Sequence, residues 1–156
     1  MASTEKKQSI EAARALLTET RAGALGSINS DGSPLVTLVA VGTMQDGAPL
    51  LLLSQIAAHT QNILREPRAS LLLEGKSDDP DPMTAPRLSL NGKIVALDKD
   101  EVAAAKSRFI EKHPGSVAYD TELDFHYYRL AVESARFNQG FGRFRKLGPS
   151  DLLIAG

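Results

Sequence analysis

The sequence contains no cysteine, which excludes disulfide bonds and thiolate metal sites. This absence suits a reducing compartment, so we expect a cytoplasmic protein. There is no tryptophan, and only 5% of the residues are aromatic, so the core must be built from Leu, Val, Ile and Ala. The net charge is −1 with no block of like charges, so we expect no binding of nucleic acid through overall charge.

Long apolar runs are also missing, and none approaches the roughly 20 residues of a membrane span. The N-terminal segment lacks the apolar core of a signal peptide. Its apolar residues instead have helical spacing from Ser9, the expected N-cap, to Thr20. A chain of 156 residues matches one domain, predicted over 1–156, with room for a substantial core. We therefore expect a soluble protein without a membrane partner.

The first half of the sequence has the pattern of short strands joined by tight turns. Residues 22–28 and 34–41 are rich in β-forming residues, and 50–53 is a continuous apolar run typical of a strand buried on both faces. Each connection between these strands contains an Asp-Gly pair, which favours a hairpin turn because glycine tolerates positive φ.

The second half predicts further strands and one long helix. The expected elements are a strand at 69–73, a loop at 75–86, a strand at 87–97, a helix at 98–112, and residues 125–132 and 134–138 as two strands or one bent strand. Asn91-Gly92 inside the 87–97 strand is either a hairpin or a β-bulge, and the length of the strand favours the bulge.

A short helix over residues 57–66 connects two of these strands, and proline at 67 ends it. The start of a helix offers unpaired N–H groups and the positive end of the helix dipole, which together attract anions. Here Ser, His and Thr side chains near that start can hydrogen-bond a phosphate. The alternative is an ordinary capped helix.

These elements predict a mainly β fold. About six antiparallel strands with helices inserted between them favour an antiparallel split β-barrel with peripheral helices over a parallel doubly wound sheet. The strand-to-helix turn at 53–57 contains no glycine, which argues against a Rossmann dinucleotide site.

Three pairs of segments connect the sequence with a known family. They are AARALL and GALGS at 12–17 and 23–27, SQIAAHTQNI and PRASLL at 54–63 and 67–72, and GFGR and PSDLL at 140–143 and 149–153. With these segments in this order, the chain resembles the FMN-binding split-barrel superfamily of pyridoxamine 5′-phosphate oxidase-like proteins. More narrowly, it resembles the haem-utilisation (HugZ-type) branch. The resemblance implies a homodimer with one FMN in each of two clefts between the subunits.

The resemblance also implies which residues hold the cofactor. The phosphate and ribityl contacts that it suggests are Ser54, Gln55, His59, Thr60 and Asn62. The oxidases carry basic residues on the preceding strand, whereas residues 33–43 contain no Lys or Arg here. Arg143 in the GFGR motif is the expected replacement cation, and the other candidates are Arg68, Arg87, Arg145 and Lys146. The alternatives are a surface role for His59 and a solvated face for the basic cluster.

Three functions remain open at this point. The first is a small FMN-dependent oxidoreductase with an unknown substrate and no identifiable catalytic base. The second is a haem-binding or haem-degrading protein on the same scaffold, although haem-degrading relatives use a C-terminal histidine and none follows His126 here. The third is a flavin-free dimeric binding module. We expect structural roles for His113 and His126, and no metal site.

Overall fold

The computed structural model describes residues 3–119, 124–140 and 142–154. The elements in chain order are α1 (Thr4–Glu19), β1 (Ala22–Ile28), β2 (Pro34–Thr43), β3 (Pro49–Ser54), α2 (Ala58–Arg65), β4 (Arg68–Glu74), η1 (Pro82–Thr84), β5 (Arg87–Ala96), α3 (Lys99–Lys112), η2 (Pro114–Ala118), β6 (Phe125–Gly140), β7 (Arg143–Leu147) and α4 (Pro149–Leu152). No helix in the described part of the chain is long and apolar enough to cross a membrane.

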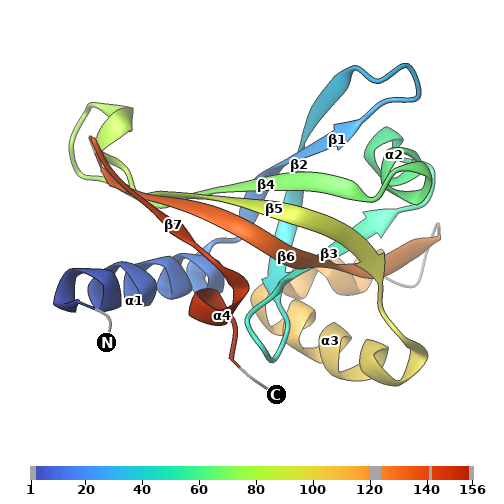
Figure 1. The fold of residues 1–156 in the computed structure, drawn as a ribbon. Helices are drawn as coiled ribbons and strands as arrows, with labels where there is room; N and C mark the ends of the chain where they lie inside the picture. The colour runs from blue at the N-terminus through green and yellow to red at the C-terminus, as the bar shows by residue number, and fades with distance from the viewer. Residues whose placement is uncertain (1–2, 120–123, 141, 155–156) are drawn as a thin grey trace.

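The strands form one antiparallel sheet that closes on itself. Their order is β3-β2-β1-β4-β5-β6-β7, and β3 also pairs with β6. The first six strands of this order therefore make a closed barrel, β7 extends the sheet beyond β6, and the helices lie outside (Figure 1). This confirms the predicted mainly β barrel with peripheral helices.

The barrel is split between β2 and β3. These strands are in register only where Val41–Thr43 pairs with Pro49–Leu51, while β2 continues along the whole length of β1. The first part of β2 thus diverges from β3 and leaves one backbone edge without a strand partner. Helix α2 follows β3 and lies beside the end of β1 (Figure 1). Five of the six predicted site residues lie at or beside this opening, and Arg143 does not.

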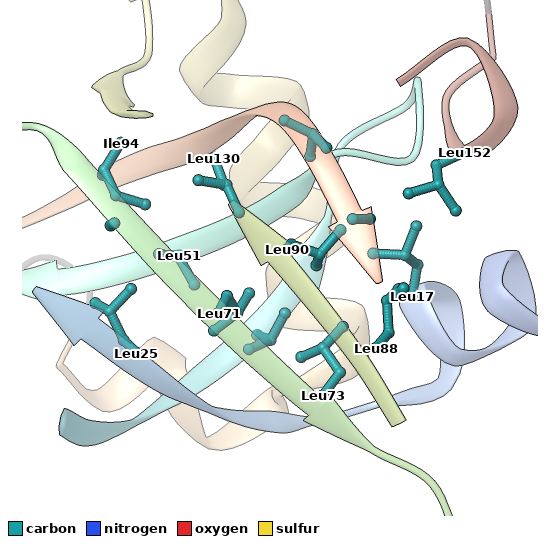
Figure 2. Close-up of a cluster of buried hydrophobic side chains, with 14 of the residues drawn as sticks. Leu17, Leu25, Leu51, Leu71, Leu73, Leu88, Leu90, Ile94, Leu130 and Leu152 are labelled. Atoms are coloured by element: carbon teal, nitrogen blue, oxygen red, sulfur yellow. The ribbon is translucent and has the colours of Figure 1, made fainter. Parts of the chain in front are cut away.

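The core is mainly aliphatic, as expected from the small number of aromatic residues. Leu25, Leu51, Leu71, Leu90 and Leu130 come from five different strands and point into the barrel, where all are fully buried (Figure 2). Side chains from α1 and α4 join the same cluster and cover one end of the barrel. Burial of these side chains stabilises the fold by about 1.5–3 kcal/mol each.

Strand β3 is buried on both faces, as its continuous apolar run predicted. Leu51 and Leu53 belong to the cluster inside the barrel. Leu50 and Leu52 face outwards and pack under α3 in a second cluster around Phe109. Helix α3 is therefore fixed to the outside of the barrel by the outer face of one strand.

The structure confirms the turns and the predicted bulge. Gly32 and Gly47 adopt φ values of 86° and 96° in the two hairpin turns. The β5–β6 register shifts between Asn91 and Gly92, as expected for a β-bulge, but the extra residue is Glu133 on the partner strand β6 and not a residue of β5. Residues 125–140 form one strand, β6, so the second of the two readings of this region, one bent strand, is correct.

One predicted element boundary was wrong, and one strand was not predicted. Helix α1 begins at Thr4, and Ser3 caps it by accepting a hydrogen bond from the Lys6 N–H. Ser9 is buried within the helix instead of capping it. Strand β7 was missed, because RFRKL alternates basic residues around one Phe and its strand conformation depends on pairing with β6.

Candidate functional site

Ser54 and Gln55 form the turn that leads from β3 into α2. The Ser54 hydroxyl accepts a hydrogen bond from the Ile56 N–H, at 3.4 Å between Oγ and N. The Gln55 side chain donates from Nε2 to the hydroxyl of Tyr128 on β6, at 2.6 Å. Both residues lie at the predicted place, at the start of the helix, and both side chains stabilise the turn itself.

His59 bridges the split in the barrel. Its Nδ1 lies 3.0 Å from the hydroxyl of Thr37 on β2, so the first turn of α2 contacts the diverging strand directly. Burial of the half-exposed ring lowers its pKa below the usual value. At pH 7 the imidazole is therefore neutral in the free protein, and it offers a phosphate hydrogen bonding without a positive charge.

Thr60 and Asn62 face the interior of the molecule. The Asn62 amide donates from Nδ2 to Ser27 Oγ and Asn29 Oδ1, at 3.0 and 2.9 Å, and thus fastens α2 to β1 and its turn. Thr60 is fully buried, and its hydroxyl has no hydrogen-bond partner among the described residues. In this conformation neither side chain is open to a ligand. The sequence analysis did not predict the hydrogen bonds from Asn62 to β1 and its turn, because the turn sequence that contains Asn29 indicated only a hairpin.

The surroundings of the α2 start are poor in positive charge. Ala57 precedes the helix without a side-chain cap, so backbone N–H groups of the first turn remain available to an anion. Arg65 donates to the Ile28 carbonyl oxygen and to Asn62, and Arg68 forms an ion pair with Glu66. The first turn of α2 and the strands before it contain no Lys or Arg.

Arg143 lies far from the other predicted site residues. It is the first residue of β7, where it pairs with Gly140, and β7 begins at the end of the sheet opposite α2 (Figure 1). Its side chain lines a hollow between α1 and the β6–β7 hairpin, together with Glu5 and Gln139. Within one chain the structure therefore brings five of the six predicted residues together and separates the sixth.

A groove on the outer face of the sheet, near β7, was not predicted. Its volume is about 530 Å³. The groove residues are Leu72, Met83, Arg87, Ser89, Arg136, Phe137, Asn138, Gly142 and Phe144. It combines exposed apolar side chains with two arginines. Arg136 was not among the candidate cations. Only the pairing of β4, β5, β6 and β7 shows that its side chain lies on the same face of the sheet as the other groove residues.

The other two histidines lie apart from this region. His113 follows α3, contacts the ring of Phe109 at 4.7 Å between centroids, and places Nε2 2.8 Å from the Val41 carbonyl oxygen. This is the structural role expected for it. His126 is exposed on β6, opposite Leu53 of β3. Within the described ranges, no group of three or more His, Asp or Glu side chains is arranged to hold a metal ion.

The family profile described as "CREG, beta-barrel" matches residues 4–152. The chain belongs to the CREG β-barrel family. It is similar to the protein "Non-canonical heme oxygenase HOZ, chloroplastic" of Arabidopsis thaliana, with 30% identity over 133 residues, which are 84% of this chain and 40% of that protein. This chain thus spans less than half the length of that relative.

Solved structures share the fold of this CREG family member. One is a heme-binding protein from Mycobacterium smegmatis, with a TM-score of 0.87, 29% identity, and coverage of 92% of this chain and 59% of that one. Another is Campylobacter jejuni ChuZ, with a TM-score of 0.80, 18% identity, and coverage of 100% and 65%. These similarities confirm the predicted split-barrel superfamily and its haem-utilisation branch.

Proposed function

We propose that this protein binds haem. The observation that carries the proposal is the charge around the α2 start, where the phosphate dianion of FMN would need a positive partner. Burial lowers the pKa of His59 in the free protein, and the nearby Arg65 and Arg68 already have partners. Burying a dianion with no positive partner is costly. The relatives from Arabidopsis and M. smegmatis, whose names refer to heme, support the same choice.

His59 is the histidine that we propose as the iron ligand. Thr37 contacts its Nδ1, while Nε2 has no partner among the described residues. A histidine that binds a metal is commonly held in place by a contact to its other ring nitrogen, and it must be neutral to bind. Bound haem iron would supply redox and oxygen chemistry, and the protein would supply position and surroundings.

FMN remains the second candidate, because of two features of the barrel opening. The N–H groups at the uncapped start of α2 suit a phosphate, and the unpaired edge of β2 offers backbone groups to the rim of a flavin ring. In that case the protein would be the small oxidoreductase first expected, with an unknown substrate. A protein that binds neither cofactor would be a flavin-free binding module.

The cofactor is tested by titrating the purified protein with hemin and with FMN while recording absorption spectra. We expect an intense Soret band with hemin and no saturable binding of FMN. His59→Ala should shift the position of the Soret band, whereas His113→Ala should leave it unchanged. If FMN binds and hemin does not, haem binding is wrong. His59→Ala should then weaken FMN binding by about ten- to a hundredfold, the value of one hydrogen bond to a charged group.

We also propose that the protein is a homodimer joined through the outer face of the sheet. Val36, Leu38 and Leu72 are 68%, 79% and 41% exposed, and the register places Leu38 and Leu72 on either side of Ala24. Such a continuous apolar surface is typical of an interface. The cytoplasmic location likewise stays a prediction.

The dimer is tested by analytical ultracentrifugation. We expect the parent protein to sediment at twice the chain mass of 16.7 kDa at micromolar concentration. Leu38→Glu places a charge in the proposed interface and should produce the monomer. Val117→Glu, at an exposed position on η2 that is 56% accessible, is the matched control and should remain a dimer. A parent protein that sediments as a monomer would contradict the proposal.

A further inference from the structure

The contact between His59 and Thr37 joins two elements at the split of the barrel. Thr37 lies before Val41, where the pairing of β2 with β3 begins, so it belongs to the part of β2 that diverges from its neighbour. His59 reaches this strand from the first turn of α2, with 3.0 Å between Nδ1 and the Thr37 hydroxyl oxygen. Of the hydrogen bonds between the described residues, only this one joins α2 to β2.

Both partners of this contact are attached to strand β1. Thr37 pairs with Leu25 in the β1–β2 register. Hydrogen bonds from the side chains of Asn62 and Arg65 fasten α2 to the end of the same strand. Because β2 and α2 are both fixed to β1, their distance from each other is fixed too. The His59 ring is therefore held in one position before any ligand binds.

The Thr37 side chain is itself restricted. The side chains of its neighbours Val36 and Leu38 are 68% and 79% exposed, and because side chains alternate along a strand, that of Thr37 points to the other face, where it is half-buried. Threonine is branched at Cβ, so few χ1 rotamers are open to it. The hydroxyl oxygen thus stays directed at the imidazole of His59.

A hydroxyl group can act in two ways towards Nδ1, and the choice decides what Nε2 can bind. If Thr37 donates, Nδ1 is the acceptor, and Nε2 carries the ring proton and can only donate a hydrogen bond. If Thr37 accepts, Nδ1 carries the proton, and the lone pair of Nε2 is available to a metal ion. In the described part of the chain His59 forms no ion pair with Asp or Glu, so its Nδ1 partner is an uncharged oxygen.

We propose that Thr37 is a positioning residue, whose hydroxyl accepts a hydrogen bond from Nδ1–H of His59 and so keeps Nε2 free for haem iron. This inference rests on the proposed haem binding and adds the residue that sets the tautomer of the ligand. A hydrogen bond from Nδ1–H makes the imidazole a stronger donor to the metal. Because the acceptor is uncharged, the effect is weaker than that of a carboxylate, and the ligand remains a neutral imidazole.

The test loads the purified protein and its variants with hemin. Thr37→Val keeps the shape of the side chain without the hydroxyl, and Thr37→Ser keeps the hydroxyl. Thr43→Val is the matched control, because Thr43 lies on the same strand, where it pairs with Pro49, and forms no hydrogen bond with His59. Circular dichroism checks that each variant folds. The readouts are hemin affinity from the Soret change, the reduction potential, and the iron–histidine stretching frequency in the resonance Raman spectrum of the reduced protein.

We expect Thr37→Val to weaken hemin binding by about ten- to a hundredfold, the usual cost of losing such a supporting contact. It should also raise the reduction potential and lower the stretching frequency, because the histidine becomes a weaker donor to the iron. Thr37→Ser should restore all three towards the parent values, and Thr43→Val should match the parent.

Two kinds of result would overturn the inference, and they are distinguishable. If the parent binds hemin and His59→Ala shifts its Soret band, but Thr37→Val keeps the potential and stretching frequency of the parent, the role of Thr37 is wrong and haem binding stands. The role of Thr37 is also wrong if His59→Ala leaves the Soret band of the bound hemin in place. If the parent binds no hemin, both this inference and the proposed function are wrong.

Discussion

Replacing Gly92 with alanine is expected to prevent the barrel from folding stably. Gly92 lies on β5 beside the bulge that Glu133 forms in β6, and a Cβ at this position would be 2.0 Å from the Ala131 carbonyl oxygen on β6. A backbone oxygen cannot move aside as a flexible side chain can. Overpacking typically costs about 1–3 kcal/mol, and this clash should exceed that range. The loss is a large fraction of the roughly 5–15 kcal/mol that stabilises a domain.

The measurement is urea denaturation followed by circular dichroism, together with the yield of soluble protein. Gly115→Ala is the matched control, because no heavy atom lies within 4 Å of a Cβ built there. We expect the control to unfold within about 0.5 kcal/mol of the parent, as surface substitutions usually do. A Gly92→Ala variant with the stability of the parent would show that the two strands can separate at the bulge without loss.

Phe109→Ala is expected to lower the free energy of unfolding by about 3–5 kcal/mol, the usual cost of removing a buried Phe side chain. Phe109 is fully buried in the cluster that joins α3 to the outer face of β3. Its ring packs edge-on against Tyr127, with 5.7 Å between centroids. Removing it leaves a cavity between helix and barrel.

The same denaturation experiment checks this prediction, with Phe144→Ala as the control. Phe144 is 53% exposed, and its substitution removes little beyond the contact with Arg136, so the loss should stay below about 1 kcal/mol. Equal stabilities of the two variants would mean that α3 contributes little to the fold.

Much of the fold could be predicted because local patterns and long-range packing agree. The Asp-Gly pairs fix their turns by backbone conformation alone, and the unbroken leucines of β3 require partners on both faces. The start of α1 was misplaced because Ser3 and Ser9 are both good caps, and only packing decides between them. Strand β7 has no apolar pattern of its own. Its strand conformation depends on antiparallel pairing with the edge of β6.

The candidate site could be predicted only in part, for a related reason. The residues around α2 are neighbours in the sequence, so their proximity follows from one turn and one helix. The separation of Arg143 from them, and the alignment of Arg136 with Arg87, depend on the register of several strands. Burial of Asn62 and Thr60 also depends on the docking of α2 against β1. Such relations are set by the tertiary structure and leave no periodic signal in the sequence.

The pairing of β3 with β6 also has a consequence for the order of folding. Strands β1 to β3 are joined by tight hairpins and can pair early, but β3 must wait for β6, which lies beyond α3 in the chain. Closing this long loop costs more entropy than closing a tight hairpin, so we expect barrel closure to be slow compared with hairpin formation. During synthesis, the nascent chain therefore holds two open sheet edges until the last long strand leaves the ribosome, and in that interval it is most exposed to aggregation.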